Sequence, residues 1–161
     1  MMTTASVSPK VGQAAPDFTL TSTSKAKITL SAFQGSKNVL LAFFPAAFTS
    51  TCTSELCALS DDFDVFAAAD VEVLPISVDA VPSLREFKDK FGMKSDLLSD
   101  FRREASRAYG VLREDTFASQ RAYFLIDKSG TVRWAHTEEH PGLRRENAEI
   151  LDAIRSAITE A

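Results

Sequence analysis

A continuous apolar run, Val39-Leu40-Leu41-Ala42-Phe43-Phe44, limits the possible folds more than any other feature of the sequence. A run of this length without polar alternation is typical of a strand that is buried on both faces of a sheet. Pro45 ends the run, because proline has no backbone N–H to contribute to a sheet. From about Thr51 onward the apolar residues recur at helical spacing instead, so we expect one long helix to follow the buried strand. The residues of that stripe are Cys52, Leu56, Leu59, Phe63 and Phe66.

The rest of the chain continues this alternation of strands and helices. Strands are expected at 15–20 and 28–30 as an N-terminal β-hairpin, at 71–78 and 97–98, and at 122–126 and 131–135 as a second hairpin. Helices are expected at 83–91, 102–109 and 143–158. This order predicts an α/β fold in which helices cover both faces of a mixed central sheet, and it also fits a thioredoxin-like core.

Length and composition are those of an ordinary globular protein. The 161 residues predict a single domain, 1–161, in which residues 1–10 form a flexible polar N-terminus. The net charge is −4 and no basic run stands out, which argues against nucleic-acid and anionic-membrane partners. No signal-peptide pattern and no long uninterrupted apolar segment is present, so we expect a cytoplasmic protein.

The chain has two cysteines, Cys52 and Cys57, which are too few for a disulfide framework that would stabilise a chain of this size. Cys52 falls where the buried strand gives way to the helix. The first N–H groups of a helix lack intrahelical partners and carry partial positive charge, so they stabilise a thiolate held there. Taken alone, Cys52 fits equally well as a small buried apolar residue, since it begins the helical stripe.

Pro45-x-x-x-Thr49-x-x-Cys52 matches the Pro-x-x-x-Thr/Ser-x-x-Cys motif of the peroxiredoxins, thiol peroxidases with a modified thioredoxin fold. Other segments resemble the same family in the same order. They are Val11-Gly12-x-x-Ala15-Pro16-Asp17-Phe18-x-Leu20, Leu97-Leu98-Ser99-Asp100 with Ala108-Tyr109-Gly110-Val111, and Arg121-Ala122-Tyr123-Phe124-Leu125-Ile126-Asp127-x-x-Gly130. On these residues the chain is identified as a member of the peroxiredoxin family.

The resemblance implies a role for each residue of the motif. Cys52 is expected to be the peroxidatic nucleophile, which attacks a hydroperoxide and becomes a sulfenic acid. Thr49 is expected to orient the peroxide, Arg121 to place a positive charge beside the thiolate, and Pro45 to shield the sulfur. Singly, Pro45 is explained as a strand end, Thr49 as a helix cap and Arg121 as a solvated charge. Glu55 also fits the family pattern, and we interpret it as an acid that supports the helix start.

Cys57 decides the subtype, and two features disagree about it. Its spacing from Cys52 matches the bacterioferritin-comigratory or PrxQ type, in which the second cysteine forms a disulfide with the first. The segment 97–101 resembles the AhpE type, many members of which use one cysteine and an external thiol. Helical periodicity places Cys57 on the polar face, fairly exposed, with its Cα roughly 8.7 Å from that of Cys52, which is beyond the ~7 Å limit for a disulfide. We therefore expect Cys57 to resolve the sulfenic acid after the first helical turns unwind, with the one-cysteine cycle as the alternative.

The family also implies the reaction partners. The substrates are expected to be hydrogen peroxide and organic hydroperoxides, and the role antioxidant defence. The reductant is expected to be thioredoxin, glutaredoxin or mycoredoxin, or a low-molecular-weight thiol. No cofactor or metal is expected, and the protein is expected to be a monomer or a homodimer.

Two other functions compete with the peroxidase interpretation. A thioredoxin-like disulfide oxidoreductase normally carries Cys-x-x-Cys, whereas four residues separate Cys52 from Cys57. A metal-binding module would combine these thiols with His136 and His140, which lie far along the chain among acidic neighbours. We expect both histidines to be surface loop residues.

Overall fold

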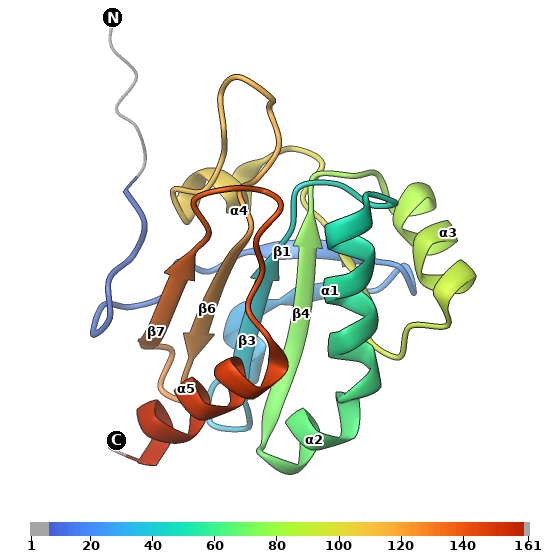
Figure 1. Cartoon of the computed structure of the whole chain (residues 1–161). Helices are drawn as coiled ribbons and strands as arrows, with labels where there is room; N and C mark the ends of the chain where they lie inside the picture. Colours follow the sequence, from blue (N-terminus) through green and yellow to red (C-terminus); the bar gives the residue numbers. More distant parts are fainter. Residues whose placement is uncertain (1–6, 160–161) are drawn as a thin grey trace, which may run out of the picture.

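The computed structural model describes residues 7–159, which form a seven-stranded mixed sheet with helices on both faces (Figure 1). The strands are β1 (Thr19–Ser22), β2 (Lys27–Thr29), β3 (Asn38–Phe43), β4 (Val71–Ser77), β5 (Leu98–Ser99), β6 (Ala122–Ile126) and β7 (Val132–Thr137). The helices are α1 (Ser50–Asp61), α2 (Phe63–Ala68), α3 (Val81–Phe91), α4 (Glu104–Ala108) and α5 (Asn147–Thr159), with a short 3-10 helix, η1 (Leu30–Phe33). The predicted α/β class, mixed sheet and N-terminal hairpin are confirmed.

The buried strand predicted from the apolar run is β3, at the centre of the sheet. The strand order is β2-β1-β5-β4-β3-β6-β7, in which β3 pairs parallel with β4 and antiparallel with β6. All six residues of β3 are buried. Its carboxyl end, Phe43, lies opposite Ala122 at the start of β6. The segments 44–49 and 119–121 therefore meet at the same end of these two strands.

Each face of the sheet has its own core, because successive side chains of a strand point to opposite faces. On one face α1, α2 and α5 cover β3, β4 and β6 (Figure 1). On the other face α4 and η1 cover the same strands, and Tyr109 packs at the centre of that cluster. A third cluster joins Phe44 and the start of α1 to α3. The prediction of helices on both faces is confirmed.

The single long helix predicted after β3 is wrong, because the chain bends at Asp62 and forms α1 and α2. The apolar stripe serves two different clusters: Cys52 and Leu56 pack toward α3, whereas Leu59 and Phe66 pack on the sheet. The bend lies beside Asn147, whose amide donates to the carbonyl oxygen of Ala58 and to Asp62. A side chain from α5 thus replaces the helical continuation.

Other boundaries differ by a few residues. The first strand begins at Thr19 and not at Ala15, since the N–H of Ala15 bonds to Gly130 and Asp17 accepts from the N–H of Ser31. The last helix begins at Asn147 and not at Leu143, and α4 is shorter than the predicted 102–109. The flexible terminus predicted for residues 1–10 falls mostly on residues 1–6, which lie outside the described range. Among residues 7–159 no helix has both the length and the apolar character that crossing a membrane requires.

Candidate active site

Cys52 lies in the first turn of α1, as predicted, directly after the loop that leaves β3. The loop turns sharply at Phe48, a non-glycine residue with φ of 67°, and Thr49 then adopts the extended conformation of an N-cap residue. Asp79 accepts a hydrogen bond from the N–H of Ala47, which ties the loop to the end of β4. Cys52 is consequently held with only 1% of its surface exposed.

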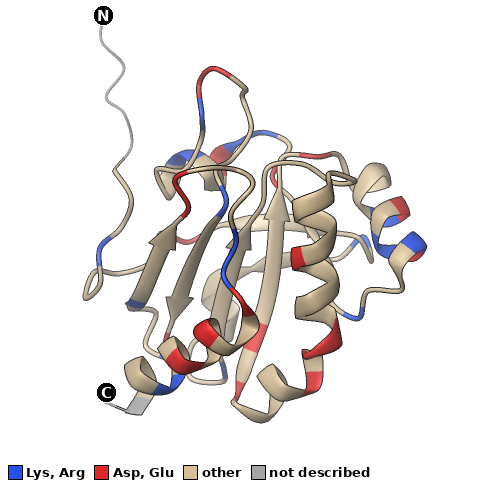
Figure 2. Ribbon diagram, in the orientation of Figure 1, with Lys and Arg blue, Asp and Glu red and all other residues tan. Residues whose placement is uncertain are grey.

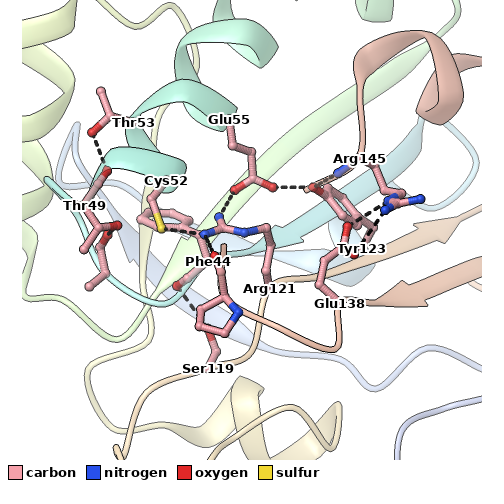
Figure 3. Close-up of polar contacts among 12 residues, drawn as sticks. Phe44, Thr49, Cys52, Thr53, Glu55, Ser119, Arg121, Tyr123, Glu138 and Arg145 are labelled. Atoms are coloured by element: carbon pink, nitrogen blue, oxygen red, sulfur yellow. Dashed lines mark hydrogen bonds and ion pairs between the residues drawn. The ribbon is translucent and has the colours of Figure 1, made fainter. Parts of the chain in front are cut away.

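Arg121 brings a positive charge to this sulfur. It precedes β6, and the pairing of Phe43 with Ala122 places it at the end of β3 from which the cysteine loop departs. Its Nη2 donates to the Sγ of Cys52 at 3.2 Å and to the carbonyl oxygen of Pro141 at 2.9 Å (Figure 3). Arg121 is only 2% exposed, so the interpretation of it as a solvated charge is wrong.

Glu55 completes the buried charge arrangement. Arg121 Nη1 donates to Glu55 Oε1 at 2.6 Å, and the hydroxyl of Tyr123 donates to Glu55 Oε2 at 2.6 Å (Figure 3). Burial raises the pKa of Glu55, while the charge of Arg121 and the two hydrogen bonds oppose the rise. The expectation that Glu55 supports the helix start is wrong, because it lies beyond the first turn and faces the sheet.

Thr49 and Pro45 lie in the loop that leaves β3, and among the described residues neither donates a hydrogen bond to the sulfur of Cys52. The Thr49 hydroxyl is exposed and donates to the carbonyl oxygen of Ala46 at 2.9 Å, which leaves its lone pairs free to accept. Thr49 is the N-cap residue, yet its side chain makes no capping hydrogen bond. Pro45 is half-buried and lines a cavity of about 240 Å³ together with Arg121 and Pro141.

Cys57 is half-buried, so the prediction that it is fairly exposed is wrong. It packs at the border of the cluster formed by α1, α3 and Phe44, because α3 covers part of the helix face that looks polar in the sequence. Burial and the nearby carboxylate of Asp61 raise the pKa of the Cys57 thiol. Figure 2 shows acidic residues gathered at the C-terminal end of α1, to which Asp61 belongs. Both cysteines are free thiols.

The two phenylalanines beside the loop differ in exposure. Phe44 is buried, whereas Phe48 is 49% exposed and rests its ring on Phe87 of α3, with centroids 4.9 Å apart. These contacts close the α3 side of the loop.

The histidines do not meet the cysteines. His136 lies within β7, half-buried and stacked on Tyr123 and Trp134, so the expectation that it is a surface loop residue is wrong. Its Nε2 lies 3.1 Å from the buried carboxylate of Glu138. His140 is an exposed loop residue, as expected. Within residues 7–159 no cluster of three or more histidine, cysteine or acidic side chains is arranged to hold a metal ion.

Tyr123 is the site residue that the sequence analysis missed. Residues two apart on a strand point to the same face, so Arg121 and Tyr123 approach α1 together. This spacing was a visible signal, but the hydroxyl's partner, Glu55, comes from a segment 68 residues away.

Comparisons with known proteins agree with this geometry. Residues 11–135 match the AhpC/TSA family. The chain is 40% identical over 151 residues to alkyl hydroperoxide reductase E of Mycobacterium tuberculosis, covering 92% of this chain and 97% of that protein. It is 35% identical over 150 residues to chloroplastic peroxiredoxin Q of Oryza sativa, covering 89% and 67% respectively. The structure resembles that of a reduced 2-Cys peroxiredoxin of Plasmodium vivax with a TM-score of 0.84 and 35% identity, covering 93% of this chain and 82% of that one.

Proposed function

We propose, from the premise that this chain belongs to the AhpC/TSA family of peroxiredoxins, that Cys52 is the thiol with which it reduces hydroperoxides. The family makes the chain a thiol-dependent peroxidase with a thioredoxin-like fold, which consumes a hydroperoxide and a thiol reductant. The observation that carries the assignment to Cys52 is the buried guanidinium of Arg121, which donates to its sulfur. Cys57 has no such cationic partner among the described residues.

The proposed reaction begins when the thiolate of Cys52 attacks the terminal oxygen of the hydroperoxide. The S–O bond forms as the O–O bond breaks, and the leaving oxygen takes a proton to become water or an alcohol. Arg121 stabilises the negative charge as it moves from sulfur to the leaving oxygen. The Thr49 hydroxyl, which already donates to Ala46, accepts a hydrogen bond from the peroxide, and Pro45 limits access by water.

We further propose that Cys57 resolves the sulfenic acid. Its thiolate attacks the sulfur of Cys52, the S–S bond forms as the S–O bond breaks, and the sulfenic oxygen takes up a proton and leaves as water. The first turns of α1 must open for this, and Thr51, Thr53 and Ser54 are weak helix formers that make the opening easier. Thioredoxin, glutaredoxin or mycoredoxin, or a small thiol then reduces the disulfide.

The raised pKa of Cys57 gives this step a pH dependence. The thiolate is the attacking species, and its fraction increases as the pH rises toward the pKa. The rate of disulfide formation should therefore increase with pH, and the sulfenic acid should persist longer in acid.

A one-cysteine cycle is the second candidate. Cys57 is half-buried in an intact helix, which favours reduction of the sulfenic acid by an external thiol. In either cycle the proposed physiological role is antioxidant defence in the cytoplasm, with hydrogen peroxide and organic hydroperoxides as substrates.

Single-turnover peroxide consumption by two matched serine variants tests the proposal. Cys57→Ser should consume the first equivalent at the wild-type rate and accumulate Cys52 as sulfenic acid, because its resolving thiol is gone; only a second equivalent of peroxide then oxidises Cys52 to sulfinic acid. Cys52→Ser should consume none. If Cys57→Ser recycled with thioredoxin as fast as the wild type, the resolving role would be wrong and the one-cysteine cycle would replace it.

A further inference from the structure

The hydroxyl of Tyr123 lies where three segments of the chain meet. Tyr123 is fully buried in β6, on the face of the sheet covered by α1 and α5. Its oxygen lies 2.6 Å from Glu55 Oε2 of α1 and 3.0 Å from the backbone nitrogen of Arg145, in the segment before α5 (Figure 3). Both distances are those of ordinary or short hydrogen bonds.

The direction of these hydrogen bonds follows from the groups that make them. A backbone N–H only donates, so the Tyr123 oxygen accepts from Arg145 and its own proton points to Glu55. Burial and the carboxylate of Glu55 raise the pKa of Tyr123, which keeps the phenol protonated. Glu55 thus receives one donor on each oxygen, Arg121 on Oε1 and Tyr123 on Oε2, as an ionised carboxylate requires.

The same carboxylate fixes the orientation of the guanidinium. Arg121 uses Nη1 for Glu55 and Nη2 for Cys52 and Pro141, while its Nε has no partner among the described residues. Within the described part of the chain, Glu55 is therefore the one carboxylate that anchors the guanidinium.

We propose that Tyr123 is a positioning residue of this peroxidase, whose hydroxyl keeps Glu55 ionised and oriented so that Arg121 remains directed at Cys52. The proposal rests on the assignment of Cys52 as the reacting thiol. Tyr123 touches neither the sulfur nor the peroxide and acts through Glu55 alone. Without the hydroxyl, Glu55 Oε2 is buried with no donor, and the free energy of the carboxylate rises relative to the carboxylic acid.

This mechanism predicts a pH-dependent defect. The charged and titratable groups that act on Glu55 are Arg121 before β6, Tyr123 on β6 and Arg144 before α5, and Cys52 of α1 shares the guanidinium of Arg121 with it. Tyr123→Phe keeps the ring and removes the hydroxyl that donates to Glu55, so it raises the pKa of Glu55. In acid the carboxyl becomes neutral, its ion pair with Arg121 is lost, and the guanidinium is free to leave the sulfur.

The test compares Tyr123→Phe with Tyr109→Phe in the full chain. Tyr109, the other tyrosine, is equally buried, but its hydroxyl donates to Pro16 on the opposite face of the sheet. Rapid-quench mass spectrometry gives the rate constant of Cys52 oxidation by hydrogen peroxide from pH 5 to pH 8. The wild-type to Tyr123→Phe ratio should rise to about tenfold or more at the acid end and fall toward one at the alkaline end, since a hydrogen bond to a charged group is worth about this factor.

Three results discriminate between the possibilities. A ratio that does not vary with pH, or an equal loss in Tyr109→Phe, would overturn the positioning role. Replacing Glu55 by glutamine in the Tyr123→Phe background should abolish the pH dependence of the ratio of the wild-type oxidation rate to that of the variant. Persistence of that pH dependence would also contradict the positioning role. If wild-type Cys52 is not oxidised at all, the assignment of Cys52 fails first, and that outcome is distinct from either of these.

Discussion

Replacing Arg121 by methionine should destabilise the protein strongly and in a pH-dependent way. Arg121→Met keeps an apolar chain of similar length but removes the hydrogen bonds to Glu55, Cys52 and Pro141. Glu55 is then a fully buried carboxylate with Tyr123 as its remaining donor. Removing one partner of a buried ion pair typically costs about 3–5 kcal/mol in the free energy of unfolding.

The pH dependence follows from the pKa of Glu55. That pKa is already raised by burial above its usual value of 4.5, and loss of the opposing charge of Arg121 raises it further. A carboxyl whose pKa is higher in the folded state favours folding when it is protonated, so stability is lost as the pH rises through the folded-state pKa. Arg121→Met should therefore lose more stability at pH 8 than at pH 5.

Urea unfolding followed by the fluorescence of Trp134, the single tryptophan, measures these free energies. The matched control is the double variant Glu55→Gln with Arg121→Met, which removes both charges of the Glu55–Arg121 ion pair and keeps a polar partner for Tyr123. It should lie within about 1–2 kcal/mol of the wild type and show little dependence on pH. A double variant as unstable as the single one, or a single variant with equal losses at both pH values, would refute the buried ion-pair account.

Two further substitutions probe the loop and the opposite face of the sheet. Thr49→Val should slow Cys52 oxidation by about tenfold with little change in stability, because it removes an exposed hydrogen-bond acceptor, whereas Thr49→Ser should keep the rate. Equal oxidation rates of the two variants in stopped-flow measurements would exclude a role for the hydroxyl. Asp100→Ala should lower the free energy of unfolding by about 2–3 kcal/mol without affecting the oxidation rate of Cys52. Buried Asp100 accepts hydrogen bonds from the N–H groups of Ala105 and Ser106 at the start of α4 and from the Ser106 hydroxyl. An unchanged urea midpoint would contradict this prediction.

The sequence predicted the features that depend on local patterns. The uninterrupted apolar run indicated a strand buried on both faces, and β3 is that strand. The helix expected at 83–91 is α3, and Gly92 ends it in the left-handed conformation that favours glycine there. The placement of Cys52 in the first turn of α1 followed from the change of hydrophobic period after Pro45.

The features that were missed depend on contacts between distant segments. Glu55 has the sequence context of an ordinary helical acid, and only the approach of β6, 66 residues later, makes it the buried partner of Arg121. Likewise, a hydrophobic period cannot reveal that Asn147 occupies the bend at Asp62. His136 was expected in a loop because its acidic neighbours hid the continuation of β7.

Cys57 depends both on a local sequence pattern and on contacts between distant segments. Helical periodicity places it on the polar face of the helix, but it does not show that Cys57 packs against the same cluster as Cys52, beside α3. Its burial and raised pKa therefore appear only in the folded structure.

The most direct test of the central claim is to add one equivalent of hydrogen peroxide to the fully reduced protein. The intact mass, the number of free thiols and the modified peptide are then recorded. We predict that Cys52 is oxidised and that both thiols are lost without a gain of oxygen, as a disulfide with Cys57. A single oxygen on Cys52 with Cys57 still free would replace the resolving step by the one-cysteine cycle. An unmodified Cys52, with both thiols intact and the peroxide unconsumed, would contradict the account.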